Sequence, residues 1–173
     1  MIELLRARRS VRKYEDRPID PETIEILKEA ALRSPSSRNI KPWQFIFVDD
    51  RGLLAELAQS KPHGASFLAG AALGVVVCAD AGKSDTWIED CSIASVLLQM
   101  TAQSLGLGSC WVQIRGRDHA DGSPAENHIR KLLGLPENLA VESIMSIGYP
   151  AETKAPIPKE ALDMEKIRHN RWA

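Results

Sequence analysis

The chain has 173 residues, of which 44% are hydrophobic and 26% charged, and its formal net charge at pH 7 is -1. That length suits a single domain over residues 1–173, and the charge balance favours neither nucleic acid nor a membrane surface as a partner. Charges before Tyr14 argue against a signal peptide, and the longest apolar run, residues 67–79, is too short to span a bilayer. We therefore expect a cytoplasmic protein.

A basic stretch lies close to the start of the chain. Five cations fall within residues 6–13, and Ser10 stands among them. A guanidinium presents a fork of donors that fits a phosphate, and a hydroxyl adds a neutral donor. From these residues alone, the stretch could equally be a solvated basic face or an arm for nucleic acid, although the rest of the chain is not basic. Apolar residues before it predict a short helix with one buried side: Ile2, Leu4 and Leu5.

Helical and strand patterns alternate along the rest of the chain. Asp20 before Pro21 predicts a helix start, and this helix should turn apolar residues as far as Leu32 inward and stop near Ser34. After a polar loop, the pattern predicts four strands, at residues 44–48, 73–79, 107–114 and 141–147, of which the second is fully buried. Between them it predicts three helices. The first is capped by Asp50, the second is a central helix at 87–105, and the third runs from a capping box at 123–126 to Leu133. By itself, this alternation favours a doubly wound parallel sheet.

Other chemistries find little support in the sequence. Three cysteines lie in apolar runs, which predicts buried reduced thiols rather than disulfides: Cys78, Cys91 and Cys110. His119, Asp121 and His128 lie close in sequence, but their spacing matches no zinc site, so we expect no metal. The chain also lacks a G-x-S-x-G nucleophile elbow, and Gly106 and Gly108 lack the third glycine of a dinucleotide-binding loop.

Six motifs occur in order along the chain. Residues 8–12 are Arg-Arg-Ser-Val-Arg, and residues 35–43 follow the pattern Pro-Ser-Ser-x-Asn-x-x-Pro-Trp. The other four are residues 106–111, 133–136, 147–150 and 170–172. In these motifs the chain resembles the nitroreductase family of FMN-dependent oxidoreductases.

The resemblance implies a fold that the alternation of patterns does not. Nitroreductases have an α+β fold, with a mostly antiparallel sheet of four to five strands flanked by helices, and they form homodimers. The extended C-terminal tail, at about residues 151–173, would cross to the partner subunit. We follow the resemblance and predict this α+β fold.

The resemblance also assigns a cofactor site. Four residues match family positions that hold FMN: Arg8, Arg9, Ser10 and Arg12. Of these, Arg8 and Ser10 would bind the phosphate and ribityl end. Arg12 matches a cation near the pyrimidine edge of the flavin, where negative charge develops on reduction. The alternative for Arg12 is a surface salt bridge with Glu15 or Asp16.

A second segment should reach the flavin from the opposite subunit. Its matching residues are Pro35, Ser36, Ser37 and Asn39. Judged from the residues alone, this segment is an ordinary polar loop between a helix and a strand. Arg38 occupies a position that is often uncharged in relatives, and it could meet a phosphate, a nicotinamide cofactor or nothing.

Two further regions complete the implied site. Four residues match the backbone that passes the isoalloxazine with a main-chain N–H near N5: Trp111, Val112, Gln113 and Ile114. Arg171 matches a C-terminal cation that closes on the phosphate, with Arg168 as the reserve candidate. Trp172 would pack against the partner subunit. From the residues alone, Trp111 could belong to the core and the tail could be solvated.

The resemblance thus implies a homodimeric FMN oxidoreductase with its sites at the subunit interface. NADH or NADPH would deliver hydride to flavin N5, and a small oxidised acceptor would then take the electrons: a nitroaromatic, a quinone, an enone or free flavin. The hydride step needs no protein acid or base, so we name no catalytic residue. One alternative is a flavin-binding or flavin-storing module without turnover, and another is a nucleic-acid binder with a basic arm.

Overall fold

The computed structural model describes residues 1–172 and is built around one sheet of four strands. The strands lie in the order β1-β2-β4-β3, and every neighbouring pair is antiparallel. Their bounds are β1 Trp43–Val48, β2 Leu73–Asp80, β3 Gly108–Gln113 and β4 Leu139–Gly148. The α+β fold implied by the resemblance is confirmed, and the parallel sheet favoured by the alternation of patterns is wrong.

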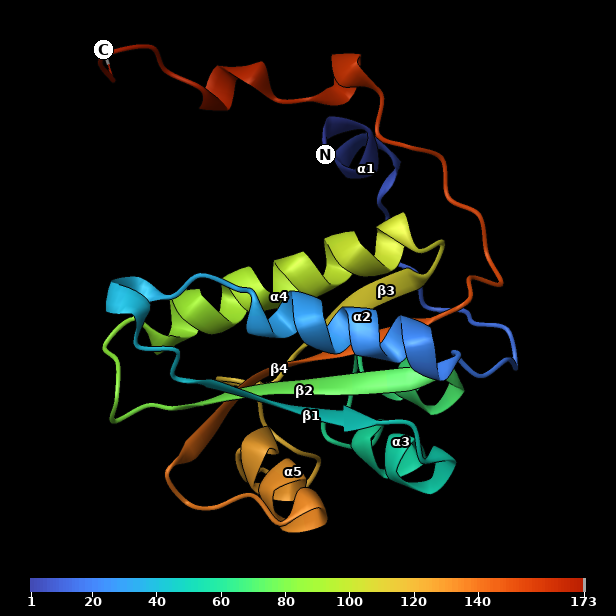
Figure 1. Cartoon of the computed structure of the whole chain (residues 1–173), viewed down its shortest axis with the longest axis vertical. Coiled ribbons are helices and arrows are strands. Elements are labelled where there is room, and N and C mark those ends of the chain that lie inside the picture. The colour runs from blue at the N-terminus through green and yellow to red at the C-terminus, as the bar shows by residue number, and fades with distance from the viewer. Residues whose placement is uncertain (173) are drawn as a thin grey trace.

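Strand β2 shows why the alternation of patterns predicted the wrong strand direction. Its residues from Leu73 to Ala79 are all buried, because helices cover both faces of the sheet. Figure 1 shows α2 (Pro21–Leu32) and α4 (Trp87–Ser104) on one face, and α3 (Arg51–Leu57) and α5 (Ala125–Leu133) on the other. A strand covered on both faces becomes a continuous apolar run whichever way its neighbours point. Apolar content therefore predicts burial but not strand direction.

The helix starts are partly as predicted. Asp20 and Asp50 cap α2 and α3, each accepting a hydrogen bond of 2.8 Å from the backbone N–H three residues on. The capping box before α5 is wrong, because no side chain caps this helix. The backbone N–H of Ser123 instead bonds Asp121 at 2.8 Å, and Glu126 accepts from the N–H of Val141 in β4 at 3.3 Å. Ser123 and Glu126, the two residues of the expected capping box, therefore bond other groups and not each other.

Several apolar side chains that the patterns placed inward lie at the surface. Helix α1 (Ile2–Ala7) forms, but none of its residues is buried, and Ile2 and Leu5 are more than half exposed. Leu32 at the end of α2 is 61% exposed. On the outer side of α4, Ile93 and Val96 are 42% and 48% exposed. The predicted inward orientation of Leu32 and of one side of α1 is therefore wrong for a single chain.

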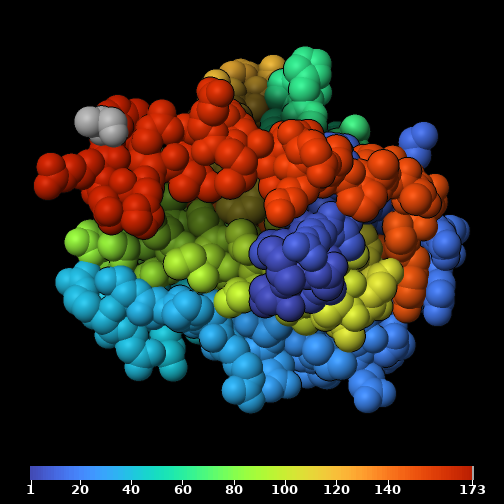
Figure 2. Space-filling view, turned by 90° about the horizontal axis from the view of Figure 1, so that it is seen from above, coloured from blue at the N-terminus to red at the C-terminus, as the bar shows by residue number. Residues whose placement is uncertain are grey.

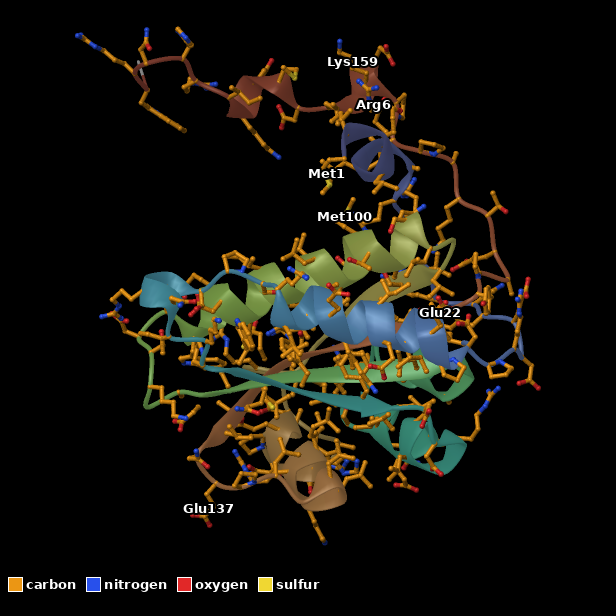
Figure 3. The ribbon with its side chains drawn as sticks, in the orientation of Figure 1. Met1, Arg6, Glu22, Met100, Glu137 and Lys159 are labelled. Carbon is orange, nitrogen blue, oxygen red and sulfur yellow. The ribbon has the colours of Figure 1, made fainter. Side chains whose placement is uncertain are left out.

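The C-terminal segment after β4 also leaves its apolar residues uncovered. It passes α1 and then turns back across the same side of the molecule, above α4 in Figure 1 and in front of the body in Figure 2. Figure 3 shows Arg6 of α1 and Lys159 of this tail at the same end of the molecule. All residues from 155 to 172 are exposed, although five of them are large and apolar: Ile157, Leu162, Met164, Ile167 and Trp172.

The cysteine prediction is confirmed. Cys78, Cys91 and Cys110 are buried and unpaired, and burial raises the pKa of each thiol. Across residues 1–172, no helix combines the length and apolar character that crossing a bilayer requires.

Candidate functional site

The basic stretch is attached to the free edge of β3. Ser10 and Ser109 form a parallel bridge, and the N–H of Val11 donates to the carbonyl of Ser109 at 3.0 Å. Gly108 permits this approach, since a Cβ built on it would lie 2.8–2.9 Å from three atoms of the Val11 side chain. The stretch therefore continues the sheet beyond β3 and has a fixed backbone.

Gly108→Ala tests this attachment. The added methyl group should push Val11 away from β3 and lower the free energy of unfolding by about 1–3 kcal/mol, as overpacking does elsewhere. Gly70→Ala is the control, because a Cβ at Gly70 has no atom within 4 Å and its φ is not positive. Urea unfolding of both variants gives the comparison, and equal stabilities would contradict the tight contact.

Residues after β4 hold the basic stretch from the other side. The Glu152 carboxylate accepts hydrogen bonds from the N–H of Arg12 at 2.6 Å and of Lys13 at 3.3 Å, and it pairs with Lys154 at 3.1 Å. Lys154 in turn donates to the carbonyl of Ser10 at 2.6 Å. The Arg12 N–H, and then Lys154, lower the pKa of Glu152. The Arg9 guanidinium donates to the carbonyl of Ala155 in the same segment, whereas the side chains of Arg8 and Arg12 are left to bind something else.

A group of cations near this stretch has no carboxylate partner. Among residues 1–172, Arg6 pairs with Glu3 and Arg51 with Asp16, whereas no ion pair includes Arg8, Arg12, Lys61 or Arg117. The suggested salt bridge of Arg12 with Glu15 or Asp16 is therefore not formed. The Arg12 guanidinium lies instead 5.7 Å from the centre of the Phe67 ring.

The charges of these cations affect two groups near strand β3, the Cys110 thiol and the Lys61 ammonium. Burial raises the pKa of the Cys110 thiol, and Arg12, a hydrogen bond from Ser10, Lys154 and Arg8 act against that rise. Burial and then the charge of Arg117 lower the pKa of Lys61, while Cys110 raises it. Cations that repel one another and lack carboxylates are stabilised when an anion binds between them. The arrangement fits a phosphate group with a polar extension.

Strand β3 contributes backbone rather than side chains. The side chains of Val112 and Ile114 are fully buried, and the Ile114 N–H already donates to the Glu142 carbonyl at 3.2 Å. The carbonyl of Ser109 points toward the basic stretch, away from β4. Because backbone groups alternate along a strand, those of Trp111 and Gln113 point to the same side. Trp111 and Gln113 therefore direct their N–H groups away from β4. The Trp111 indole donates to the Gln113 side chain at 2.9 Å.

The loop around Ser37 lies far from the basic stretch. Its short 3-10 turn, Ser37–Asn39, sits at the start of α4, where the N–H of Ser37 donates to Asp90 at 2.9 Å. A small pocket bordered by Arg9 and Gln103 places the basic stretch at the other end of the same helix, and Figure 1 shows both positions. Asp90 and Gln103 lie 13 residues apart in α4, so about 20 Å separates them along the helix axis. Within one chain the two predicted halves of the site therefore lie apart.

The predicted tail cations also stay apart from the basic stretch. Arg168 donates to the Ile167 carbonyl at 3.2 Å and lies 5.1 Å from the Trp172 ring, so its contacts are within the tail. Arg171 is exposed. Sequence reasoning missed the nearer Lys154 and its partner Glu152. Their charges are visible in the sequence, but nothing local signals contacts with residues about 140 positions away.

The histidines do not form a metal site. The rings of His119 and His128 stack with centres 4.7 Å apart, and His119 lies 3.2 Å from the Asp121 carboxylate. Within residues 1–172 there is no group of three or more side chains that could hold a metal ion.

Known proteins identify the fold and the family. A model of the nitroreductase family matches residues 5–63 and 53–149. A solved FMN-dependent nitroreductase from Clostridium difficile is 43% identical, covers 99% of this chain and 100% of its own, and superposes with a TM-score of 0.97. A relative in Archaeoglobus fulgidus, provisionally named an NADH dehydrogenase/NAD(P)H nitroreductase, is 38% identical over 88% of this chain and 87% of its own.

A more distant solved structure carries a nicotinamide cofactor. It is the NADPH:FMN oxidoreductase of Vibrio harveyi in complex with NAD+, 26% identical, with a TM-score of 0.81 over 99% of this chain and 77% of that one. The family predicted from the six motifs is confirmed. With matches over most of its length to the family model and to these relatives, the chain belongs to the nitroreductase family and is a nitroreductase-like oxidoreductase.

Proposed function

We propose that the protein is a homodimeric FMN-dependent oxidoreductase. It would take hydride from NADH or NADPH and pass electrons to a small oxidised acceptor such as a nitroaromatic, a quinone, an enone or free flavin. The observation that carries this proposal is that Arg8 and Arg12, on either side of Ser10, form no ion pair with a carboxylate within residues 1–172. In a chain of this family, the anion that suits them is the phosphate of FMN.

The donors present fit that phosphate. Arg8 offers a guanidinium fork and Ser10 a hydroxyl, and Lys154, which also pairs with Glu152, adds an ammonium beside them. The Ser10 backbone is fixed by the bridge to Ser109. Donors on a rigid backbone lose little entropy when the ligand binds, which favours tight retention.

Arg12 would act at the opposite end of the cofactor. When bound, FMN would supply the redox chemistry by accepting and releasing hydride at N5. Arg12 would stabilise the negative charge that reduction places on the pyrimidine edge. The outward N–H groups of Trp111 and Gln113 would orient the ring by hydrogen bonding.

Features that a single chain leaves incomplete support the proposed dimer. The loop at Pro35–Asn39 and the basic stretch lie at opposite ends of α4, so a flavin that meets both would lie between two subunits. The exposed apolar residues of α1, of the outer side of α4 and of the tail supply a surface for the partner. Arg168 and Arg171 would reach a phosphate only once the tail has crossed to that partner.

Purification and reduction test the proposal. The protein should be yellow, release FMN on denaturation, and lose its flavin absorbance when mixed anaerobically with NADH or NADPH. A colourless protein that binds no added FMN would refute the proposal. Bound flavin that neither cofactor reduces would favour the flavin-storing alternative.

Arg12→Gln should leave FMN bound but lower the midpoint potential of the flavin. The reason is that a cation beside the pyrimidine edge favours the negatively charged reduced state. Spectroelectrochemistry measures the potential, and Lys13→Gln, at an exposed neighbour, is the control. Equal potentials in the two variants would remove Arg12 from the flavin site.

A further inference from the structure

The loop after α2 has an unfavourable backbone conformation. Of the four non-glycine residues with positive φ in residues 1–172, three lie here: Arg38 at 51°, Asn39 at 54° and Lys41 at 54°. Asparagine tolerates this left-handed region, but arginine and lysine rarely occupy it. Such conformations persist only where surrounding contacts impose them, and they concentrate at functional sites.

Three side chains hold the loop in this conformation. Ser36 lies within it and accepts a hydrogen bond from the N–H of Lys41 at 2.8 Å. The other two are carboxylates near the start of α4: Asp85 pairs with the Arg38 guanidinium, and Asp90 accepts from the N–H of Ser37 at 2.9 Å. The Asp85 pair is exposed to solvent and contributes little. Asp90 is therefore the buried side chain that connects the loop to α4 by a hydrogen bond.

The burial of Asp90 costs the fold free energy. It is only 2% exposed, its Oδ2 atom is buried without a hydrogen-bond partner within residues 1–172, and the buried thiol of Cys91 follows it. Removing a carboxylate from water is costly unless hydrogen bonds satisfy it, and the helix N-terminus offsets only part of that cost. A small apolar residue would suit this position better, so stability does not explain the aspartate.

We propose that Asp90 is a positioning residue that fixes the loop at residues 35–41 for contact with the flavin of the partner subunit. The proposal rests on the FMN-binding function proposed above. Asp90 itself touches no cofactor. It orients the Ser37 backbone and thereby the polar side chains of the loop. Loss of Asp90 would therefore weaken FMN binding at a site that is mainly built by the other chain.

Three variants separate positioning from general stability. Asp90→Ala removes the acceptor for the Ser37 N–H, whereas Asp90→Asn keeps an acceptor oxygen and removes the buried charge. Glu89→Ala is the control, because Glu89 is exposed in the same turn of α4 and forms no side-chain hydrogen bond or ion pair with the loop within residues 1–172. Fluorescence titration of the apoproteins should give FMN affinities about tenfold weaker for Asp90→Ala, and close to wild type for Asp90→Asn and Glu89→Ala.

A second measurement follows the loop without any flavin. Trypsin can cut after Arg38, which is exposed, but not after Lys41, because proline follows it. In the apoprotein, cleavage after Arg38 should be faster for Asp90→Ala than for the wild type, while the melting temperature should not fall in parallel. Asp90→Asn and Glu89→Ala should resist trypsin as the wild type does.

Each outcome bears on a defined part of the proposal. Equal cleavage rates in Asp90→Ala and wild type would show that Asp90 does not hold the loop. Faster cleavage with unchanged FMN affinity would show that the held loop does not serve the flavin. An Asp90→Asn variant as weak as Asp90→Ala, or losses that follow the melting temperature, would reduce Asp90 to a structural role. If the wild type bound no FMN, the proposed function would fail while trypsin still decided whether Asp90 holds the loop.

Discussion

Replacing Arg8 with alanine should weaken FMN binding by roughly tenfold to a hundredfold, since a charge-assisted hydrogen bond contributes about 1.5–3 kcal/mol. Arg6→Ala should leave the affinity almost unchanged. The two arginines lie two residues apart, but Arg6 is engaged with Glu3 on the exposed side of α1. Arg8 has no carboxylate partner within residues 1–172 and acts on the same Cys110 thiol as Ser10 and Lys154.

Fluorescence titration of the two apoproteins with FMN measures this difference. The comparison is sharp because both variants lose one positive charge from the same stretch, so a general electrostatic attraction for the cofactor would weaken both equally. Equal affinities in Arg8→Ala and Arg6→Ala would therefore refute the assignment of Arg8 to the phosphate.

Mixing Arg8→Ala subunits with Ser37→Trp subunits should restore part of the activity that each homodimer has lost. If each site takes its basic stretch from one chain and its loop from the other, a mixed dimer places both defects in one site. Its second site is then intact. Random exchange of equal amounts makes half of the dimers mixed, so about a quarter of all sites should be active.

NADH- or NADPH-dependent reductase activity, measured before and after exchange of subunits, reports the outcome. The prediction rests on the separation of the two segments, which contact α4 at positions about 20 Å apart along the helix. Activity that stays flat after exchange has been verified would mean that each chain builds its own site.

The sequence predicted the elements well because local patterns determine them. Asp20 and Asp50 cap their helices through residues three positions away, and Gly134 ends α5 with a φ of 67°. Strand direction was not predictable, because β2 is apolar on both faces and carries no signal of which neighbour it pairs with.

The outward apolar residues show a second limit of sequence reasoning. Leu32 and Leu5 have the spacing of residues that face a core, yet both are exposed in the single chain. An apolar side of a helix predicts that something covers it, not that the same chain does. The same limit applies to Glu152 and Asp90, whose partners lie 140 and 53 positions away in the sequence.

The position of Glu152 in the chain has a consequence for synthesis. All four strands are complete by Gly148, yet the basic stretch near the start of the chain is held by Ser109 and by Glu152 and Lys154. Contacts so distant in sequence form late, after the costly closure of long loops. Synthesis of the four strands is therefore not enough to build the proposed phosphate site, and FMN loading should follow the docking of Glu152 and Lys154 on the basic stretch.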